Sequence, residues 1–205
     1  MSPHRYDDLL PLGDECHGVI IADVSGHGAS SALVMAMAKM LLLTNASTSK
    51  TPSETLDCIN SDLVNLVNTN KFITVFYAVL DLNKSQLNYT SAGHCPVFII
   101  DKESREITLL ESDGFFVGMF PELGIQNHTI DFEGSKKRLI LFTDGITEAM
   151  NADEEQYGDD RLAKSALRQL DFPPKKATEM MLTDHKNFLS DSPYGDDITL
   201  LIIDF

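Results

Sequence analysis

The hydrophobic pattern of the N-terminal third changes from a strand-like run to a helical segment. The short apolar, β-branched run at residues 18–23, GVIIAD, predicts a buried strand. Residues 28–45 have the length and the Ala, Leu and Met content of a helix, with Ser30 or Ser31 as the expected N-cap. Because this segment is apolar on nearly every side, we expect it to be buried or covered by a partner.

A second helix is expected to begin at Pro52 or Ser53. Apolar residues recur on one face of it at helical spacing: Leu56, Ile59, Leu63, Leu66 and Val67. The two segments therefore predict a helical pair, and we expect the helices around residues 30–69 to support a homodimer.

The pattern of the remaining chain favours strands first and then a mixture of helices and strands. Strands separated by short turns, which we interpret as an antiparallel meander, are expected at residues 72–82, 86–94, 96–101 and 106–112. Further strands are expected at 125–132, 137–144 and 197–204, and helices near 161–170 and 174–189. Because strands and helices are grouped rather than strictly alternating, the pattern predicts a layered α+β fold.

Length and composition indicate one globular domain over residues 1–205. The 205 residues are 43% hydrophobic, which is enough to bury a substantial core. No segment has the roughly 18–20 apolar residues of a membrane span, and the N-terminus does not resemble a signal peptide. The three cysteines are widely scattered, which gives a zinc site or disulfides little support. We expect a cytoplasmic protein without a membrane span in this chain.

The formal net charge of −15 argues against nucleic acid as a partner, because phosphate backbones are bound by basic surfaces. An acidic chain that acts on an anionic substrate needs another concentrated source of positive charge. Bound divalent cations would supply it.

Aspartates stand at the ends of three expected strands. Asp23 ends the first strand, Asp144 ends the strand at 137–144, and Asp196 with Asp197 begins the last strand. If the last strand is antiparallel to the other two, these carboxylates lie at one sheet edge. Carboxylates that converge need raised pKa values or cations, and oxygen ligands prefer magnesium or manganese.

A pair of such ions clamps a phosphoryl group and activates water, which points to a phosphate-ester hydrolase. Gly26, Gly28 and Gly145 would let the backbone approach the ions closely. Asp before Gly is also ordinary turn chemistry, so the combination of the three aspartates, and no single one, favours this interpretation.

Five stretches in order resemble one family. They are ADVSGHG with ASSALVMAMAK, then FITVFYAVLD, SAGHCPVF, LILFTDGITEAMN and YGDDITLLIID. From about Leu9 to Phe205 the chain resembles the SpoIIE/RsbU type of bacterial serine/threonine phosphatase, within the metal-dependent protein phosphatase (PPM) superfamily. The resemblance implies an αββα sandwich of two antiparallel sheets flanked by helices, with two manganese or magnesium ions at one end.

The resemblance also implies a set of site residues. Asp23 matches the bridging ligand, Val24 offers a backbone carbonyl, and Asp144 matches the ligand of the TDG motif. Asp196 matches the ligand in the closing motif, with Asp197 as its second member. Asp23, Asp144 and Asp196 are accordingly the expected catalytic residues.

The implied activity is removal of phosphate from a phosphorylated anti-sigma-factor antagonist, by direct attack of a metal-bound water. One segment departs from the family pattern: where the family has GGDxYD, this chain has PHRYDD, with Arg5 in place of the first aspartate and Asp8 at the second. Either the chain is the C-terminal excerpt of a longer sensor-phosphatase, or the site is altered. The alternative function is therefore a weak or inactive pseudophosphatase that binds a signalling partner. A two-metal phosphodiesterase is disfavoured by the motif order.

Four other features have mainly structural interpretations. His27 is expected near the metal ions as a hydrogen-bonding residue rather than a ligand, and His94 as a turn histidine. Glu148 is expected at the surface. The YGDD motif at 157–160 is expected to cap the next helix.

Overall fold

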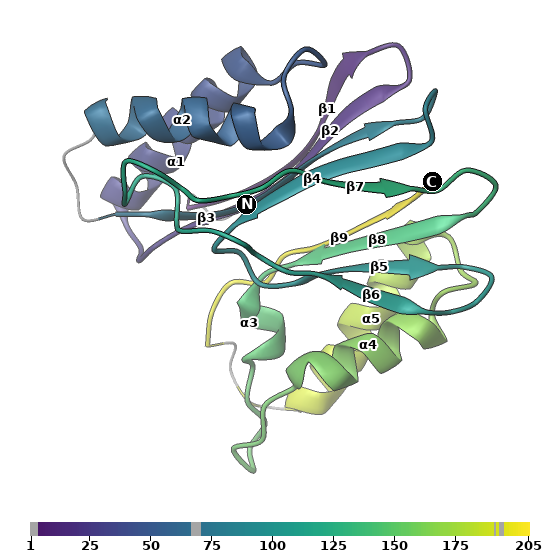
Figure 1. The fold of residues 1–205 in the computed structure, drawn as a ribbon. Coiled ribbons are helices and arrows are strands. Elements are labelled where there is room, and N and C mark those ends of the chain that lie inside the picture. The colour runs from purple at the N-terminus through teal and green to yellow at the C-terminus, as the bar shows by residue number, and fades with distance from the viewer. Residues whose placement is uncertain (1–3, 67–70, 191, 193–194) are drawn as a thin grey trace. The chain divides into compact units, whose positions relative to one another are not determined.

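The computed structural model describes residues 4–66, 71–190, 192 and 195–205. The chain divides into two compact units. The first unit comprises Met1–His94 and Glu111–Glu133, and the second comprises Cys95–Leu110 and Gly134–Phe205. Each unit consists of one antiparallel sheet and its own helices (Figure 1).

The sheet of the first unit has five strands in the order β1-β2-β3-β4-β7, and every neighbouring pair is antiparallel. Its strands are β1 (Arg5–Gly13), β2 (Cys16–Val24), β3 (Ile73–Asp81), β4 (Gln86–Ala92) and β7 (His128–Asp131). The long central strands are nearly continuous runs of buried residues, as expected for strands covered on both faces.

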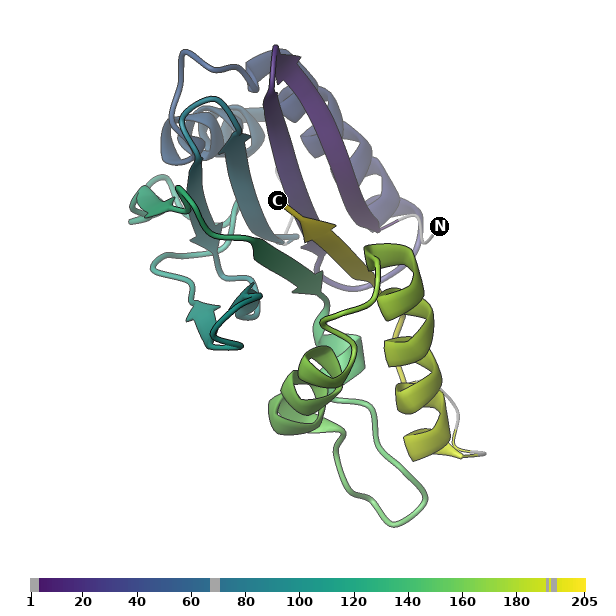
Figure 2. The same cartoon turned by 90° about the vertical axis from the view of Figure 1, so that its right-hand side faces the viewer.

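Helices α1 (Ala29–Asn45) and α2 (Pro52–Leu66) lie side by side over one face of this sheet (Figures 1 and 2). Alternate residues of β2, including Ile20, Ala22 and Val24, join the helices in one apolar core. The intervening residues of β2, among them Asp23, therefore lie on the sheet face opposite the helices.

A long segment between β6 and β7 is fixed to the first unit by Asn60 of α2. The buried Asn60 amide donates to the carbonyl oxygens of Phe120 (2.9 Å) and Pro121 (3.2 Å) and accepts from the backbone N–H of Gly118. The backbone of Val117 also pairs with Ile73 at the start of β3. This segment is thus held at the end of the sheet where β2 terminates.

The second unit is a four-stranded antiparallel sheet in the order β6-β5-β8-β9. Its elements are β5 (Val97–Asp101), β6 (Ile107–Leu110), β8 (Lys137–Phe142), α3 (Asp144–Thr147), α4 (Gly158–Arg168), α5 (Pro174–Leu189) and β9 (Leu200–Asp204). Residues of β5 and β8 such as Phe98 and Phe142 pack with Leu162 of α4 and Met181 of α5 in the core of this unit.

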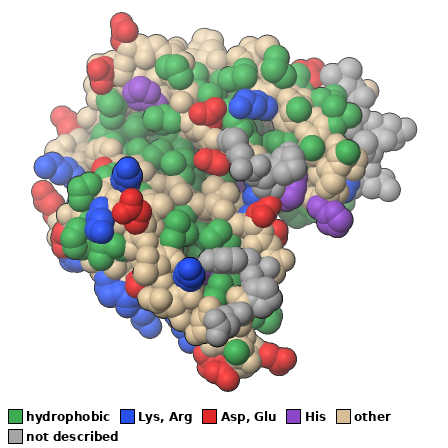
Figure 3. Space-filling model, turned by 180° about the vertical axis from the view of Figure 1, so that it is seen from behind, with side chains coloured by type: hydrophobic (Ala, Val, Ile, Leu, Met, Phe, Trp, Pro, Cys, Tyr) green, Lys and Arg blue, Asp and Glu red, His purple; other side chains and the backbone are tan. Residues whose placement is uncertain are grey.

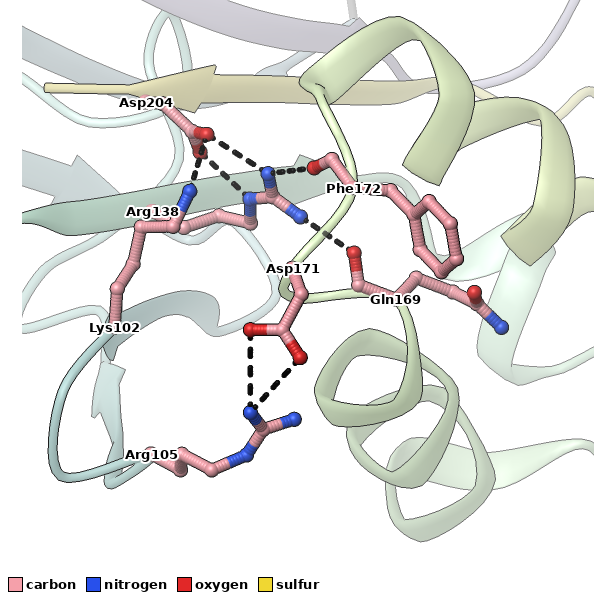
Figure 4. Close-up of polar contacts among 7 residues, drawn as sticks. All are labelled: Lys102, Arg105, Arg138, Gln169, Asp171, Phe172 and Asp204. Atoms are coloured by element: carbon pink, nitrogen blue, oxygen red, sulfur yellow. Dashed lines mark hydrogen bonds and ion pairs between the residues drawn. The ribbon is translucent and has the colours of Figure 1, made fainter.

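A buried arginine joins the sheet of the second unit to the turn between α4 and α5 (Figure 4). Arg138 of β8 is fully buried and pairs with both oxygens of Asp204 on β9, at 2.6 and 2.8 Å. Its remaining N–H groups donate to the carbonyl oxygens of Gln169 and Phe172. Lys102 adds a second cation on Asp204, at 2.7 Å.

The predicted α+β class, with two antiparallel sheets and helices, is confirmed, as are the helical segments near 28–45 and 174–189. Val67 lies outside the described residues. The four strands predicted as one meander are instead divided into two hairpins: β3 and β4 in one sheet, and β5 and β6 in the other. The predicted caps Ser30 and Ser31 lie inside α1, whose N-cap is Gly28.

Candidate metal centre

The first candidate ligand, Asp23, lies one residue before the end of β2. The β1–β2 register places it directly opposite Arg5, and the Arg5 Nε donates to Asp23 Oδ2 at 3.0 Å. The Arg5 side chain is 4% exposed and that of Asp23 is 20% exposed. A guanidinium is ionised at every ordinary pH, so this carboxylate has a permanent cation beside it.

The loop after Asp23 is fixed by the hydrogen bonds of Ser25. Its backbone N–H donates to the Phe72 carbonyl, and its hydroxyl oxygen accepts from the Phe72 N–H. Its carbonyl oxygen accepts from the Lys71 ammonium at 3.0 Å and from the Ser31 hydroxyl at 3.2 Å. Gly26 follows with a φ of 73°, a left-handed conformation that explains why glycine stands there. The loop therefore leads from the aspartate to the start of α1 by a defined path.

His94, at the end of the β4 segment, is linked to Asp23 through Thr74. The Thr74 hydroxyl lies 3.3 Å from His94 Nδ1 and 3.5 Å from the backbone oxygen of Asp23. His94 is almost completely buried. Thr74 thus connects His94 to the backbone of Asp23, and the structural role expected for this histidine stays a prediction.

In the second unit the other candidate ligands come from two adjacent segments. Asp144 is the first residue of the four-residue helix α3, two positions after β8 ends, so it does not itself end the strand. Asp196 lies in a bend and Asp197 directly after it, three or more residues before β9, so the prediction that they begin the last strand is also wrong. All three aspartates are exposed.

Gly145 brings these two segments into direct contact. A Cβ atom at this position would overlap the backbone oxygen of Asp197 and would lie 3.5 Å from Asp196 Cβ. Next to it, the Thr143 N–H donates to the Thr199 carbonyl, and the Thr143 hydroxyl accepts from the Thr199 N–H. Asp144 and the Asp196–Asp197 pair thus emerge from backbones that touch, as expected for the antiparallel pair β8–β9.

The short helix α3 is supported from α5 by a buried histidine. His185 Nε2 lies 3.0 Å from the carbonyl oxygen of Ile146, and its ring packs edge-on against Tyr157. Burial lowers the pKa of His185, and the hydrogen bond with Ile146 opposes this shift only in part. His185 therefore connects α5 to the helix that carries Asp144.

The two units differ in how well they suit a divalent cation. Asp144 and Asp196 are exposed carboxylates on backbone segments that touch at Gly145, and carboxylate oxygens are the donors that a hard ion such as magnesium or manganese prefers. At Asp23 the Arg5 guanidinium already supplies a positive charge. Within the described ranges, no three His, Cys, Asp or Glu side chains form a ready-made metal site.

The other features singled out in the sequence are Asp8, His27, Glu148 and the motif at 157–160. Asp8 is opposite Ile20 in the sheet and accepts a hydrogen bond from the Tyr6 hydroxyl. His27 and Glu148 are exposed. The motif at 157–160 forms the start of α4, with its two aspartates in the first turn, as expected.

Sequence reasoning missed the ion pair of Arg5 with Asp23. The departure at Arg5 was visible in the sequence. Its contact depends on the register of β1 against β2, which is set by the turn after Gly13 and which the hydrophobic pattern does not specify.

Comparisons with known proteins agree on one family. The family described as Stage II sporulation protein E (SpoIIE) matches residues 13–205. Phosphoserine phosphatase RsbU of Bacillus subtilis is 30% identical over 193 residues, which cover 92% of this chain and 56% of that protein. The chain spans between about a third and just over half of the length of the curated relatives it matches.

Solved structures show the same fold. The SiaA-PP2C domain of Pseudomonas aeruginosa has a TM-score of 0.83 at 18% identity, covering 99% of this chain and 86% of that chain. RsbX in complex with magnesium has a TM-score of 0.68 at 17% identity, covering 98% and 86%. Because the family match extends over nearly the whole chain, the protein belongs to the SpoIIE family.

Proposed function

We propose that this chain is a metal-dependent serine/threonine phosphoprotein phosphatase. The observation that carries the proposal is the contact at Gly145, which sets the acid of the TDG motif beside the acids of the closing motif. Membership in the SpoIIE family and the similarity to a phosphoserine phosphatase support it.

In this proposal Asp23, the Val24 carbonyl, Asp144 and Asp196 are the ligands of manganese or magnesium, with Asp197 as a further ligand. When bound, such an ion neutralises phosphate charge and lowers the pKa of water. Gly145 and the Thr143–Thr199 hydrogen bonds keep Asp144 and Asp196 in register. Thr74 contacts the backbone oxygen of Asp23, and Ser25 holds the loop that follows Asp23. These contacts preorganise the acids before any substrate arrives.

We further propose a phosphorylated anti-sigma-factor antagonist as the substrate and the cytoplasm as the place of action. The relative RsbU, whose name states its phosphoserine activity, supports the chemical class of the substrate. No helix in the described part of the chain is long and apolar enough to cross a membrane.

The test is hydrolysis of a phosphoserine peptide with and without manganese, using the chain and its Asp144→Asn variant. We expect hydrolysis that requires both the metal and Asp144. Asp159→Asn serves as the control, because Asp159 is an exposed acid in the first turn of α4. Hydrolysis that persists without metal, or that Asp144→Asn leaves unchanged, would contradict the proposal.

The second candidate function is a weak or inactive pseudophosphatase that binds a signalling partner. The Arg5–Asp23 ion pair favours it, since a proposed metal ligand is engaged by a side chain. Under this alternative, the chain fails to hydrolyse the phosphopeptide but binds the phosphoprotein tightly. Manganese-dependent turnover by the chain would exclude it.

We also propose that α1 is a homodimer contact. Its exposed large apolar residues are Leu33, Met40 and Leu43. They recur at helical spacing, so they share one face. Figure 3 views the molecule from the side on which α1 lies, and hydrophobic side chains are visible at that surface. Replacing Leu33 and Met40 by Gln should lower the sedimentation mass from dimer to monomer while the circular dichroism spectrum stays unchanged.

A further inference from the structure

We propose that the Arg5 guanidinium is a built-in cation that takes the place of one divalent ion at Asp23. The chain then binds one metal ion where the two-ion arrangement would bind two. This inference rests on the proposed function, because it concerns the same acids. It assigns a role to a residue of β1 that lies upstream of the family match, which begins at residue 13.

The position of Arg5 is set by the pairing of β1 with β2. Arg5 is directly opposite Asp23 in the β1–β2 ladder, so the contact is fixed by backbone pairing rather than by a chance surface rotamer. Immediately after this position the Val24 N–H donates to the His4 carbonyl at 3.0 Å, which continues the pairing to the end of β2. The guanidinium is therefore delivered to the strand end where Asp23 lies.

The Arg5 guanidinium also brings a positive charge to this strand end. The cost of burying a guanidinium has to be offset by anions, and Asp23 supplies one of them at 3.0 Å. A metal ion at Asp23 would need a carboxylate oxygen as its donor. Here Oδ2 accepts from Arg5 Nε. A divalent ion placed at the same oxygen would be repelled by the buried guanidinium.

An acid at position 5 would have the opposite effect on the charge around Asp23. An aspartate opposite Asp23 would leave two carboxylates facing each other, and these require a cation between them. Arg5 reverses that requirement, because it sets a cation instead of an anion opposite Asp23. With Arg5 in place of an aspartate, the protein itself supplies a cation at Asp23.

A guanidinium also differs from a metal ion in what it can do. It binds phosphate oxygens through paired N–H groups, but it does not lower the pKa of water as a divalent ion does. Arg5 can therefore replace the charge of an ion and its hold on phosphate. The acids of the second unit remain as donors for the one ion that the chain binds.

The experiment is titration of the protein with manganese chloride alone, followed by isothermal calorimetry. We expect one ion per chain for the wild type and two for Arg5→Asp. Arg105→Gln is the control, because Arg105 forms an exposed ion pair with Asp171 elsewhere in the chain. We expect it to bind one ion, like the wild type.

Two bound ions in the wild type would overturn the inference without any variant. One ion in an Arg5→Asp protein with an unchanged circular dichroism spectrum would also overturn it. Phosphopeptide hydrolysis is measured separately. A wild type that binds one ion and an Arg5→Asp variant that binds two support the inference even if neither hydrolyses the peptide, and that last result would count against the proposed function alone.

Discussion

Among the described residues, two buried arginines pair with aspartates, and their surroundings differ. Arg138 donates to both oxygens of Asp204 and to two backbone carbonyls, and Lys102 shares the same carboxylate. Arg5 donates through Nε to Asp23 at the end of a strand that leads into a glycine-containing loop. The Arg138 pair closes a turn within the core of its unit. The Arg5 pair lies where the fold turns toward a candidate site.

The difference shows that an ion pair has to be interpreted by what else its members hold. Asp204 is satisfied by two cations within its own unit, which is typical of a structural network. Asp23 is followed by a loop whose path is fixed by Ser25, and its backbone is linked to a buried histidine through Thr74. Hydrogen bonds of this kind fix the backbone around the aspartate, which indicates that the direction of its side chain matters.

The largest effect is expected from Arg138→Met. The change leaves Asp204 without its bidentate partner and leaves the carbonyls of Gln169 and Phe172 without their donor, so it should cost about 3–5 kcal/mol of stability. Urea unfolding measures this. Added manganese should not restore the loss, and a recovery with manganese would erase the contrast between the two arginines.

Arg5→Met is expected to cost less, about 1–3 kcal/mol, because it removes a partner of Asp23 but not a brace between a sheet and a turn. Since manganese can replace the lost positive charge, it should raise the melting temperature of this variant more than that of the wild type. Thermal unfolding at several manganese concentrations provides the measurement. An equal rise in both proteins would contradict a shared position of metal and guanidinium.

A smaller effect is expected from pH. Burial alone would raise the pKa of Asp204, but the hydrogen bonds from Arg138 and Lys102 outweigh burial and hold that pKa below its ordinary value of 3.8. A lowered pKa in the folded state stabilises the fold above the ordinary value, and this contribution disappears as pH falls through the lowered pKa. Between pH 7 and pH 3 the wild type should therefore lose more stability than Asp204→Asn. Parallel losses in the two proteins would argue against this network as the source.

The smallest effect is expected from Arg105→Gln. Its ion pair with Asp171 (Figure 4) is exposed and should contribute less than about 1 kcal/mol, although Arg105 also donates to the Leu167 carbonyl. Urea unfolding at low and at high salt tests this. A loss of stability comparable with that of Arg138→Met would mean that burial does not explain the difference between the Arg105–Asp171 and Arg138–Asp204 ion pairs.

The sequence predicted the elements better than their pairing. Helix α5 was predicted with its correct limits, because Pro174 marks its start and an apolar face runs through it. The meander was wrong because the segment after Ala92 passes to a second sheet, and hydrophobic alternation does not name the partner of a strand.

The candidate site divides in the same way. Asp23, Asp144 and Asp196 with Asp197 were predicted to converge at one sheet edge. Within the second unit, the contact at Gly145 shows that the backbone segments carrying Asp144 and Asp196 touch, and the convergence of all the acids stays a prediction. The start of the last strand was misplaced because Ile198 and Thr199 are β-branched, yet both precede the ladder, and Thr199 hydrogen-bonds with Thr143. The position of Arg5 required the register of a strand pair. The roles proposed for these residues as metal ligands stay a prediction.

The close approach at Gly145 has a consequence for variation at this position. Even a methyl group would collide with the backbone at Asp197, and backbone atoms cannot move aside as the end of a flexible side chain can. Any chain of this fold with a larger residue here has to relocate its closing acidic segment. The residue at position 145 therefore indicates, in natural variants, whether that segment has kept its place.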